Sequence, residues 1–120
     1  MSVFSGALLA ILEEAGTAVL TLTEGVDEGE FFASRLTREE SKRQVQTLAR
    51  TTLQVPPECR RLMPEIDWDG WLKVGHDLPL KANEEGRELL WFAIRSLTPA
   101  TLLWLRVYRQ NQPELFDFSA

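Results

Sequence analysis

Hydrophobic side chains recur every three to four residues along most of the chain, which is the period of an amphipathic helix. The clearest stripe runs from residue 4 to residue 23 and predicts a helix that ends before Gly25. Its members are Phe4, Leu8, Ile11, Leu12, Ala15, Val19 and Leu22. A short helical turn is expected at 28–34, where it would bury Phe31 or Phe32.

The ends of the next helix are marked by polar residues and proline. Thr37 and Glu40 have the spacing of a capping box, in which each side chain satisfies the free backbone amide of the other residue. The helix is expected to run to about residue 53, because Pro56 restricts the residue before it to extended conformations. Its inward positions are expected to be Val45, Leu48, Ala49, Thr52 and Leu53.

The segment that follows has shorter helical signals. Residues 58–63 are expected to form one or two turns before Pro64, and Asp67 is expected to cap another helix. The apolar contacts of that helix would be Trp68, Trp71 and Leu72. Because Pro79 interrupts any helix, 76–83 is the least regular part of the chain in this prediction.

The last third of the chain predicts two helices. Asn83 can cap a helix over 84–97, which is apolar nearly all round and is therefore buried or shared between a core and a partner. Thr98 and Pro99 have the pattern of an N-cap followed by proline, so a separate helix is expected from there to about residue 112. A short tail, 113–120, follows.

No segment alternates between apolar and polar residues as a strand would. We therefore predict an all-α fold, an antiparallel four- to five-helix bundle, in a single domain over 1–120. A chain of 120 residues and 13.7 kDa has the size of one domain.

Composition excludes several kinds of site. Cys59 is the single cysteine and His76 the single histidine, so a disulfide framework, a cysteine-based zinc site and a histidine pair on a metal are ruled out. We expect no metal and no cofactor. No apolar run approaches the roughly 18–20 residues that span a bilayer, and the N-terminus lacks the basic region of a secretory signal. A cytoplasmic protein without membrane contact is expected.

Charge is distributed unevenly along the chain, whose net charge is −5. The first 34 residues carry six acidic residues and no basic one, whereas 35–61 carries seven basic residues against three acidic ones. A basic ridge is expected from Arg35, Arg38, Lys42 and Arg43. Because the chain as a whole is acidic, a solvated face or contact with an acidic partner is favoured over RNA for this ridge.

Aromatic residues suggest an interface. The chain has four tryptophans, and Trp91 and Phe92 cannot both face one stripe of a helix. Tryptophan and tyrosine dominate the energetic centres of protein interfaces. We expect a homodimer or partner interface that includes Trp91, Phe92, Trp104 and Tyr108. The tail residues are Leu115, Phe116 and Phe118. The sequence leaves open whether they fold back on their own bundle or pack against a neighbouring molecule.

The order of these motifs resembles the HepT-like branch of the HEPN superfamily. The most specific part is Pro64-Glu65-Ile66-x-Trp68 with the turn before it, and the ending, Trp104 and then Pro113-Glu114-Leu115, is also similar. The resemblance covers about residues 7–70 and 98–116. It implies a small helical bundle that dimerises, in a family that includes many ribonucleases paired with a small nucleotidyltransferase as toxin and antitoxin. Catalysis in that family rests on an arginine and, a few residues later, a histidine.

This sequence departs from the catalytic pattern. If His76 were the histidine, the arginine would stand at residue 69, 70 or 71, which are Asp69, Gly70 and Trp71. Matching forward from Trp68 places the histidine near Leu80. Matching backward from Trp104 places it near Ala93 and the arginine near Glu88. Extra residues near 76–86 fall where the active site should be, so we expect a catalytically silent protein that acts through a homodimer and a nucleotidyltransferase-type partner.

Two alternatives remain from the sequence. A divergent metal-free ribonuclease would use His76 with Lys73, Arg87 or Arg95, and it predicts a basic concavity around His76. An unrelated helical adaptor would make the resemblance a coincidence. That alternative predicts a bundle without an antiparallel pair of long helices at 4–23 and 38–54.

Overall fold

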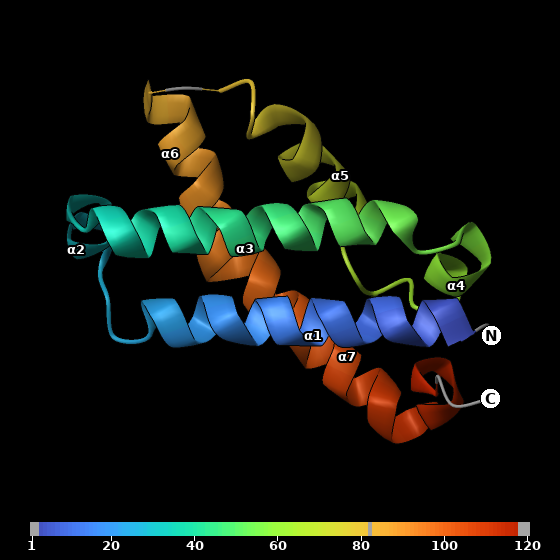
Figure 1. The fold of residues 1–120 in the computed structure, drawn as a ribbon. Coiled ribbons are helices and arrows are strands. Elements are labelled where there is room, and N and C mark those ends of the chain that lie inside the picture. The colour runs from blue at the N-terminus through green and yellow to red at the C-terminus, as the bar shows by residue number, and fades with distance from the viewer. Residues whose placement is uncertain (1–2, 82, 118–120) are drawn as a thin grey trace.

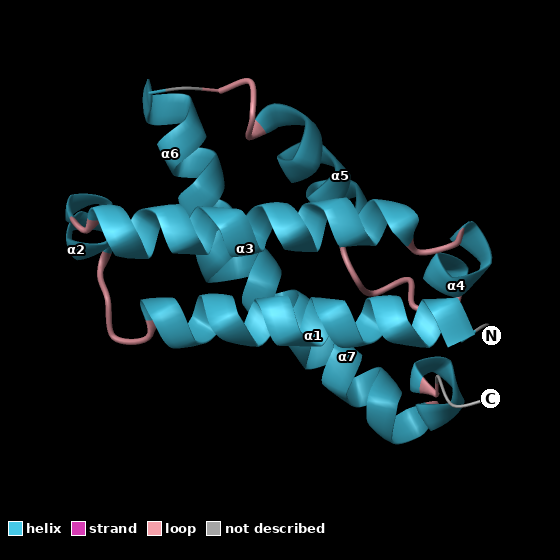
Figure 2. Ribbon diagram, viewed as in Figure 1, coloured by secondary structure: helices cyan, strands magenta, loops and turns pink. Residues whose placement is uncertain are grey.

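The computed structural model describes residues 3–81 and 83–117, and within these ranges it consists of helices joined by short loops (Figures 1 and 2). The α-helices are α1 (Val3–Thr23), α2 (Glu28–Ala33), α3 (Arg35–Gln54), α4 (Pro57–Arg61), α5 (Trp68–Asp77), α6 (Asn83–Phe92) and α7 (Thr98–Asn111). A π-helical turn spans Ala93–Leu97 and a 3-10 turn spans Pro113–Phe116. The described residues contain no strand, so the predicted all-α class is confirmed.

Two long helices form the centre of the bundle. Helices α1 and α3 run antiparallel and make the most extensive contact in the structure. Helix α5 packs on α3, and α6 and α7 pass behind the α1–α3 pair as one continuous rod (Figure 1). The antiparallel pair is the feature that the unrelated-adaptor alternative excluded.

Helix α1 supplies a large share of the core. Leu9, Leu12 and Val19 are completely buried, as the stripe predicted for Leu12 and Val19. Ile11 was expected inside but is 42% exposed, because Leu9 occupies the inward position beside Leu12. Gly25 follows the helix with a φ of 70°, the left-handed conformation of a helix-ending residue.

The length of α1 also corrects a prediction. Its segment Ser5–Thr23 is long and apolar enough, by length and composition, to cross a membrane, so the expectation that no run approaches that length is wrong. In the structure this segment packs against α3 and α7 and buries one face completely. That is the environment of the core helix of a globular fold.

The start of α3 differs from the capping box predicted at Thr37. Ser34 ends α2 and caps α3 at the same time, with its Oγ accepting the backbone N–H of Thr37 at 3.4 Å. Helix α3 therefore begins at Arg35. The side chain of Glu40 accepts hydrogen bonds from the side chains of Arg43 and Gln44, and not from a backbone amide. The capping box of this region belongs to α2, where Asp27 and Glu30 satisfy each other's amides.

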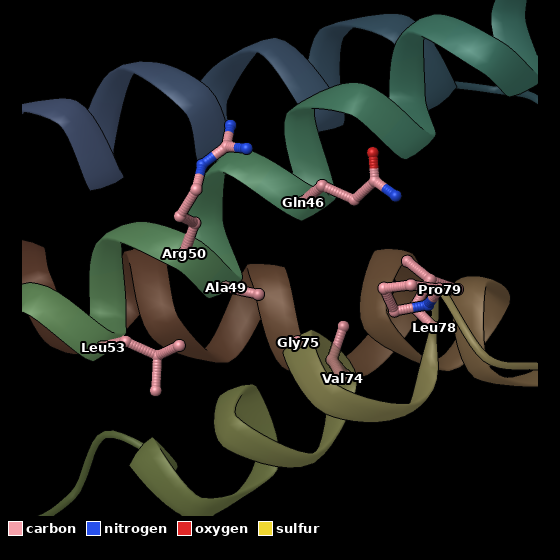
Figure 3. A pocket seen from close by; sticks show the side chains of 8 residues that line it. All are labelled: Gln46, Ala49, Arg50, Leu53, Val74, Gly75, Leu78 and Pro79. Atoms are coloured by element: carbon pink, nitrogen blue, oxygen red, sulfur yellow. The ribbon is translucent and has the colours of Figure 1, made fainter.

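Most of the apolar positions predicted to face inward in α2 and α3 are buried, and in α5 Trp71 is completely buried. Both phenylalanines of α2 are buried, as are four of the five inward positions expected in α3. Leu53 and Leu72 are the exceptions, each 51% exposed. Leu53 instead lines a shallow pocket of about 290 Å³ between α3 and α5, together with Ala49 and Val74 (Figure 3).

The sequence predicted a new helix starting at Thr98 and Pro99. In the structure, the preceding helix continues through these two residues without a break. The backbone N–H and the side-chain Oγ1 of Thr98 both donate to the carbonyl oxygen of Ala93, the hydroxyl at 2.8 Å. This wide π-helical turn accommodates Pro99, which has no N–H to donate and would clash in a regular helix. Residues 83–111 consequently form one helix with an irregular turn at its middle.

The C-terminal tail folds back on its own bundle. Leu115 and Phe116 are buried, and the 3-10 turn packs against α1 and α7. The approach is close enough that a Cβ atom placed on Gly6 would lie 2.8 Å from the carbonyl oxygen of Asp117. This settles the alternative left open for Leu115 and Phe116, whereas Phe118 lies outside the described residues.

Candidate functional site

A basic pocket lies between the first half of α3, the end of α5 and the start of α6. Its volume is about 230 Å³, and its basic residues are Arg38, Lys42, Lys81 and Arg87. The other lining residues are Phe32, Glu39, Leu78, Asn83, Gly86 and Leu90. In Figure 1 this region is at the end of the molecule where α6 stands above α3, next to α2.

Phe32 positions two of the arginines. Its backbone carbonyl accepts a hydrogen bond of 2.7 Å from Nη1 of Arg38. Its ring lies under the guanidinium of Arg87, with 4.4 Å between Cζ and the ring centroid. Phe32 is itself buried and packs edge-on against Phe31. Both guanidinium groups therefore contact one buried residue from α2.

Positive charge in the pocket is only partly compensated. Within the described ranges, no carboxylate lies at ion-pair distance from Arg38, Lys42 or Arg87. Lys81 pairs with Glu85 at 3.1 Å, and this hydrogen bond raises the pKa of Lys81. Glu39, the acidic residue of the lining, is paired at 3.1 Å with an arginine outside the pocket.

The predicted basic ridge is divided by the structure. Arg38 and Lys42 line the pocket, whereas Arg35 and Arg43 lie outside it and pair with glutamates of α3. The sequence did not indicate that Arg87 lies near Arg38 and Lys42. It suggested Arg87 as a partner of His76 instead. Arg87 is almost fifty positions away from Arg38 in the chain, so periodicity along one helix could not reveal their proximity.

His76 stands apart from this pocket. It is near the end of α5, its side chain is 74% exposed, and Nδ1 lies 2.8 Å from Oδ1 of Asp77. That hydrogen bond lowers the pKa of Asp77. The adjacent hollow between α5 and α6 carries charges of both signs, from Lys73, Asp77, Lys81, Glu85 and Glu88. The basic concavity that a ribonuclease centred on His76 requires is not found at this hollow.

The arginines named for the ribonuclease alternative are engaged elsewhere. Arg95 donates to the carbonyl of Val26 and lies 4.5 Å over the ring of Trp91. Arg87 lies over Phe32. Among the described residues, neither arginine nor Lys73 is hydrogen-bonded to His76.

The positions at which the resemblance places catalytic groups hold other chemistry. Glu88 is an exposed carboxylate on α6, and Ala93 is completely buried in the π-helical turn. Leu80, the position reached by matching forward, is a 70% exposed apolar residue. These positions offer neither a guanidinium nor an imidazole to a phosphodiester.

The four aromatic residues predicted for an interface differ in exposure. Trp91 is half-buried against Phe31, with 5.3 Å between ring centroids, and Tyr108 is buried next to a half-buried Trp104. Phe92 is 46% exposed and lines the hollow between α5 and α6, whose volume is about 540 Å³. Of the four, Phe92 is the side chain most open to a partner.

Metal chemistry finds no support in the described part of the chain, where no three histidine, cysteine, aspartate or glutamate side chains converge. Cys59 is buried, and desolvation raises the pKa of its thiol, which disfavours the nucleophilic thiolate. No protein-family model, curated protein or solved structure matches this chain.

Proposed function

We propose that this chain is a HepT-like helical protein that lacks ribonuclease activity and acts by binding. In this proposal it forms a homodimer and binds a partner protein, such as a nucleotidyltransferase of a toxin–antitoxin-type system, in the cytoplasm. The motif order of the sequence supports the family, and the antiparallel α1–α3 pair is compatible with it. The proposal requires no metal and no cofactor.

The observation that carries the proposal is the chemistry at the catalytic positions. Metal-free RNA cleavage needs a base beside the 2′-hydroxyl group and a cation beside the phosphate. Glu88 would repel the phosphate, and the methyl side chain of Ala93 is completely buried. His76 has an aspartate and no arginine beside it in the described structure. Because those groups are missing at the catalytic positions, we expect the bundle to act by binding.

A ribonuclease assay tests the catalytic part of the proposal. The purified protein is incubated with structured and single-stranded RNA, in parallel with His76→Ala, and the products are resolved by size. We expect neither protein to cleave RNA above the background of a mock purification. Cleavage by the parent protein that is lost in His76→Ala would establish the ribonuclease and end this proposal.

Partner binding is tested in the native host. A tagged chain is captured together with its associated proteins, and these are identified by mass spectrometry. We expect a protein of the nucleotidyltransferase type to be recovered with the chain and to bind it again after both are purified. Failure of the purified pair to associate would contradict that choice of partner.

A further inference from the structure

We propose that the basic pocket binds a phosphate monoester group. This inference rests on the arrangement of Arg38, Lys42 and Arg87 and is independent of the proposed function. Phosphate monoesters occur as small molecules and as phosphorylated side chains of proteins, and inorganic phosphate is the simplest analogue of both. The chemistry that the pocket would recognise is the same for both sources.

Preorganised guanidinium groups are the first support. Arginine presents a planar fork of donors that matches two oxygens of a phosphate group. Arg38 and Arg87 are held by the carbonyl and the ring of the same buried residue, Phe32. These contacts restrict both arginines before an anion binds, which lowers the ordering cost of binding.

The second support is the positive charge of the pocket, which favours anions with more than one negative charge. Arg38, Lys42 and Arg87 have no carboxylate partner within the described ranges, while Lys81 and Glu39 are already paired. A phosphate monoester carries about −1.5 to −2 charges near neutral pH and has three strong acceptor oxygens. A single carboxylate, or a phosphodiester of a nucleic acid, brings one negative charge and compensates the three cations less completely.

The dimensions of the pocket restrict the ligand further. Its volume of about 230 Å³ lies below the range of roughly 300–1,000 Å³ of sites for drug-sized ligands. That volume accommodates a phosphate group and the few atoms next to it. The buried side chains of Leu78 and Leu90 form part of the wall. Apolar walls lower the local dielectric and strengthen the interaction between the cations and an anion.

The start of α6 contributes to the same side of the pocket. Asn83 has a φ of 63°, and a Cβ atom on Gly86 would lie 2.5 Å from the carbonyl oxygen of Lys81. Position 86 therefore requires a glycine, because any side chain there would collide with the backbone of Lys81. This close approach holds Lys81 at the rim of the pocket.

Binding is measured on the full chain by isothermal titration calorimetry and by NMR. Inorganic phosphate is titrated at constant ionic strength, with acetate as the carboxylate control. We expect saturable binding of phosphate, with shifts of the Arg38 and Arg87 side-chain signals, and no saturation by acetate. Absence of saturation by phosphate, or equal binding of acetate, overturns the proposal.

Variants separate the pocket from the general charge of the protein. Arg87→Gln and Lys42→Met each remove one unpaired cation and are expected to weaken phosphate binding about tenfold. Arg43→Gln removes the same charge from the same helix as Lys42, outside the pocket, and is expected to retain the parent affinity. Thermal melting verifies that each variant is folded. An equal loss in Arg43→Gln would show that only the overall field attracts the anion and would overturn the site.

The source of the phosphate group is assigned by competing ligands. The probes are inorganic phosphate, a phosphoserine peptide, the same peptide without phosphate, and a single-stranded RNA oligonucleotide. Phosphopeptide binding at least about tenfold tighter than that of inorganic phosphate would assign a phosphorylated protein, and comparable affinities would assign a small phosphate. In both cases the unphosphorylated peptide must fail to bind at the pocket. RNA that displaces phosphate more effectively than either monoester would overturn the choice of ligand.

Discussion

The indole Nε1 of Trp71 donates a buried hydrogen bond of 2.9 Å to Oγ1 of Thr101, which joins α5 to α7. The hydroxyl proton of Thr101 is used in a second bond, to the carbonyl oxygen of Leu97 at 2.7 Å. The oxygen of Thr101 is therefore oriented as an acceptor for the indole. Because Leu97 belongs to the π-helical turn, this pair connects the irregular part of the long helix to α5.

Removal of the Thr101 hydroxyl should destabilise the fold. Thr101→Val keeps the shape of the side chain but leaves the buried indole N–H of Trp71 without an acceptor, a cost of about 1–3 kcal/mol in the free energy of unfolding. Thr101→Ser keeps the acceptor and should lose less. Urea denaturation followed by tryptophan fluorescence measures both values. A serine variant as unstable as the valine variant would show that the hydrogen bond contributes nothing.

A methyl group on Gly6 should displace the C-terminal turn from α1. A Cβ atom there would meet the carbonyl oxygens of Phe116 and Asp117, the latter at 2.8 Å, and such a clash costs about 1–3 kcal/mol. Gly29→Ala is the control, because an added Cβ at this helical position meets a single side-chain oxygen at 3.4 Å. We expect the control to retain or increase stability, since alanine favours helix over glycine. Equal thermal stability of the two variants would contradict the close packing of the tail.

The helix cap at Ser34 can be tested against the one suggested by sequence. Ser34→Ala removes the oxygen that accepts the amide of Thr37 and should lower the free energy of unfolding by about 0.5–2 kcal/mol. Thr37→Ala leaves that backbone amide and its acceptor in place, so its effect should be smaller. The two variants are compared by chemical denaturation. A larger loss in Thr37→Ala would place the helix start where the sequence alone suggested.

The pH dependence of Asp77 follows from its hydrogen bond with His76. This bond holds the pKa of Asp77 below its ordinary value in the folded protein, with smaller contributions from the charges of Lys81 and Lys73. A lowered carboxyl pKa stabilises the fold above the pKa of the unfolded chain, and the contribution is lost as the pH falls through the folded pKa. In His76→Ala the pKa of Asp77 should rise. NMR titration of the carboxyl carbon measures it, and a larger rise in Lys81→Met than in His76→Ala would contradict the assigned cause.

Exposure of Phe92 predicts a contribution to self-association. A stable dimer interface buries more than about 1,000 Å² in total, and an aromatic side chain that is 46% exposed beside a hollow is suited to its centre. Light scattering at micromolar concentration should give twice the mass of 13.7 kDa for the parent chain. Phe92→Ser should shift the mass toward one chain, whereas Leu36→Ser, at another exposed apolar residue, should not. A parent protein of single-chain mass would contradict the dimer.

Helix boundaries illustrate where local sequence is ambiguous. Ser34 and Thr37 are both good capping residues three positions apart, and either can begin α3. The choice depends on α2, which ends at Ser34 and leaves no room for a longer loop. Thr98 and Pro99 are equally good as a helix start, and only the packing of the turn around Ala93 shows that the helix continues through them.

The helical class, most inward positions of α1 and α3 and the cap at Asp67 were predicted, because the spacing of apolar residues and the chemistry of capping are properties of neighbouring positions in the chain. The basic pocket was not. Arg38 and Lys42 share a helix face and could be paired from the sequence, but Arg87 lines the same pocket only because the tertiary fold places it over the ring of Phe32 in α2. Contacts between distant segments depend on how whole helix faces fit together, and no local pattern encodes that fit.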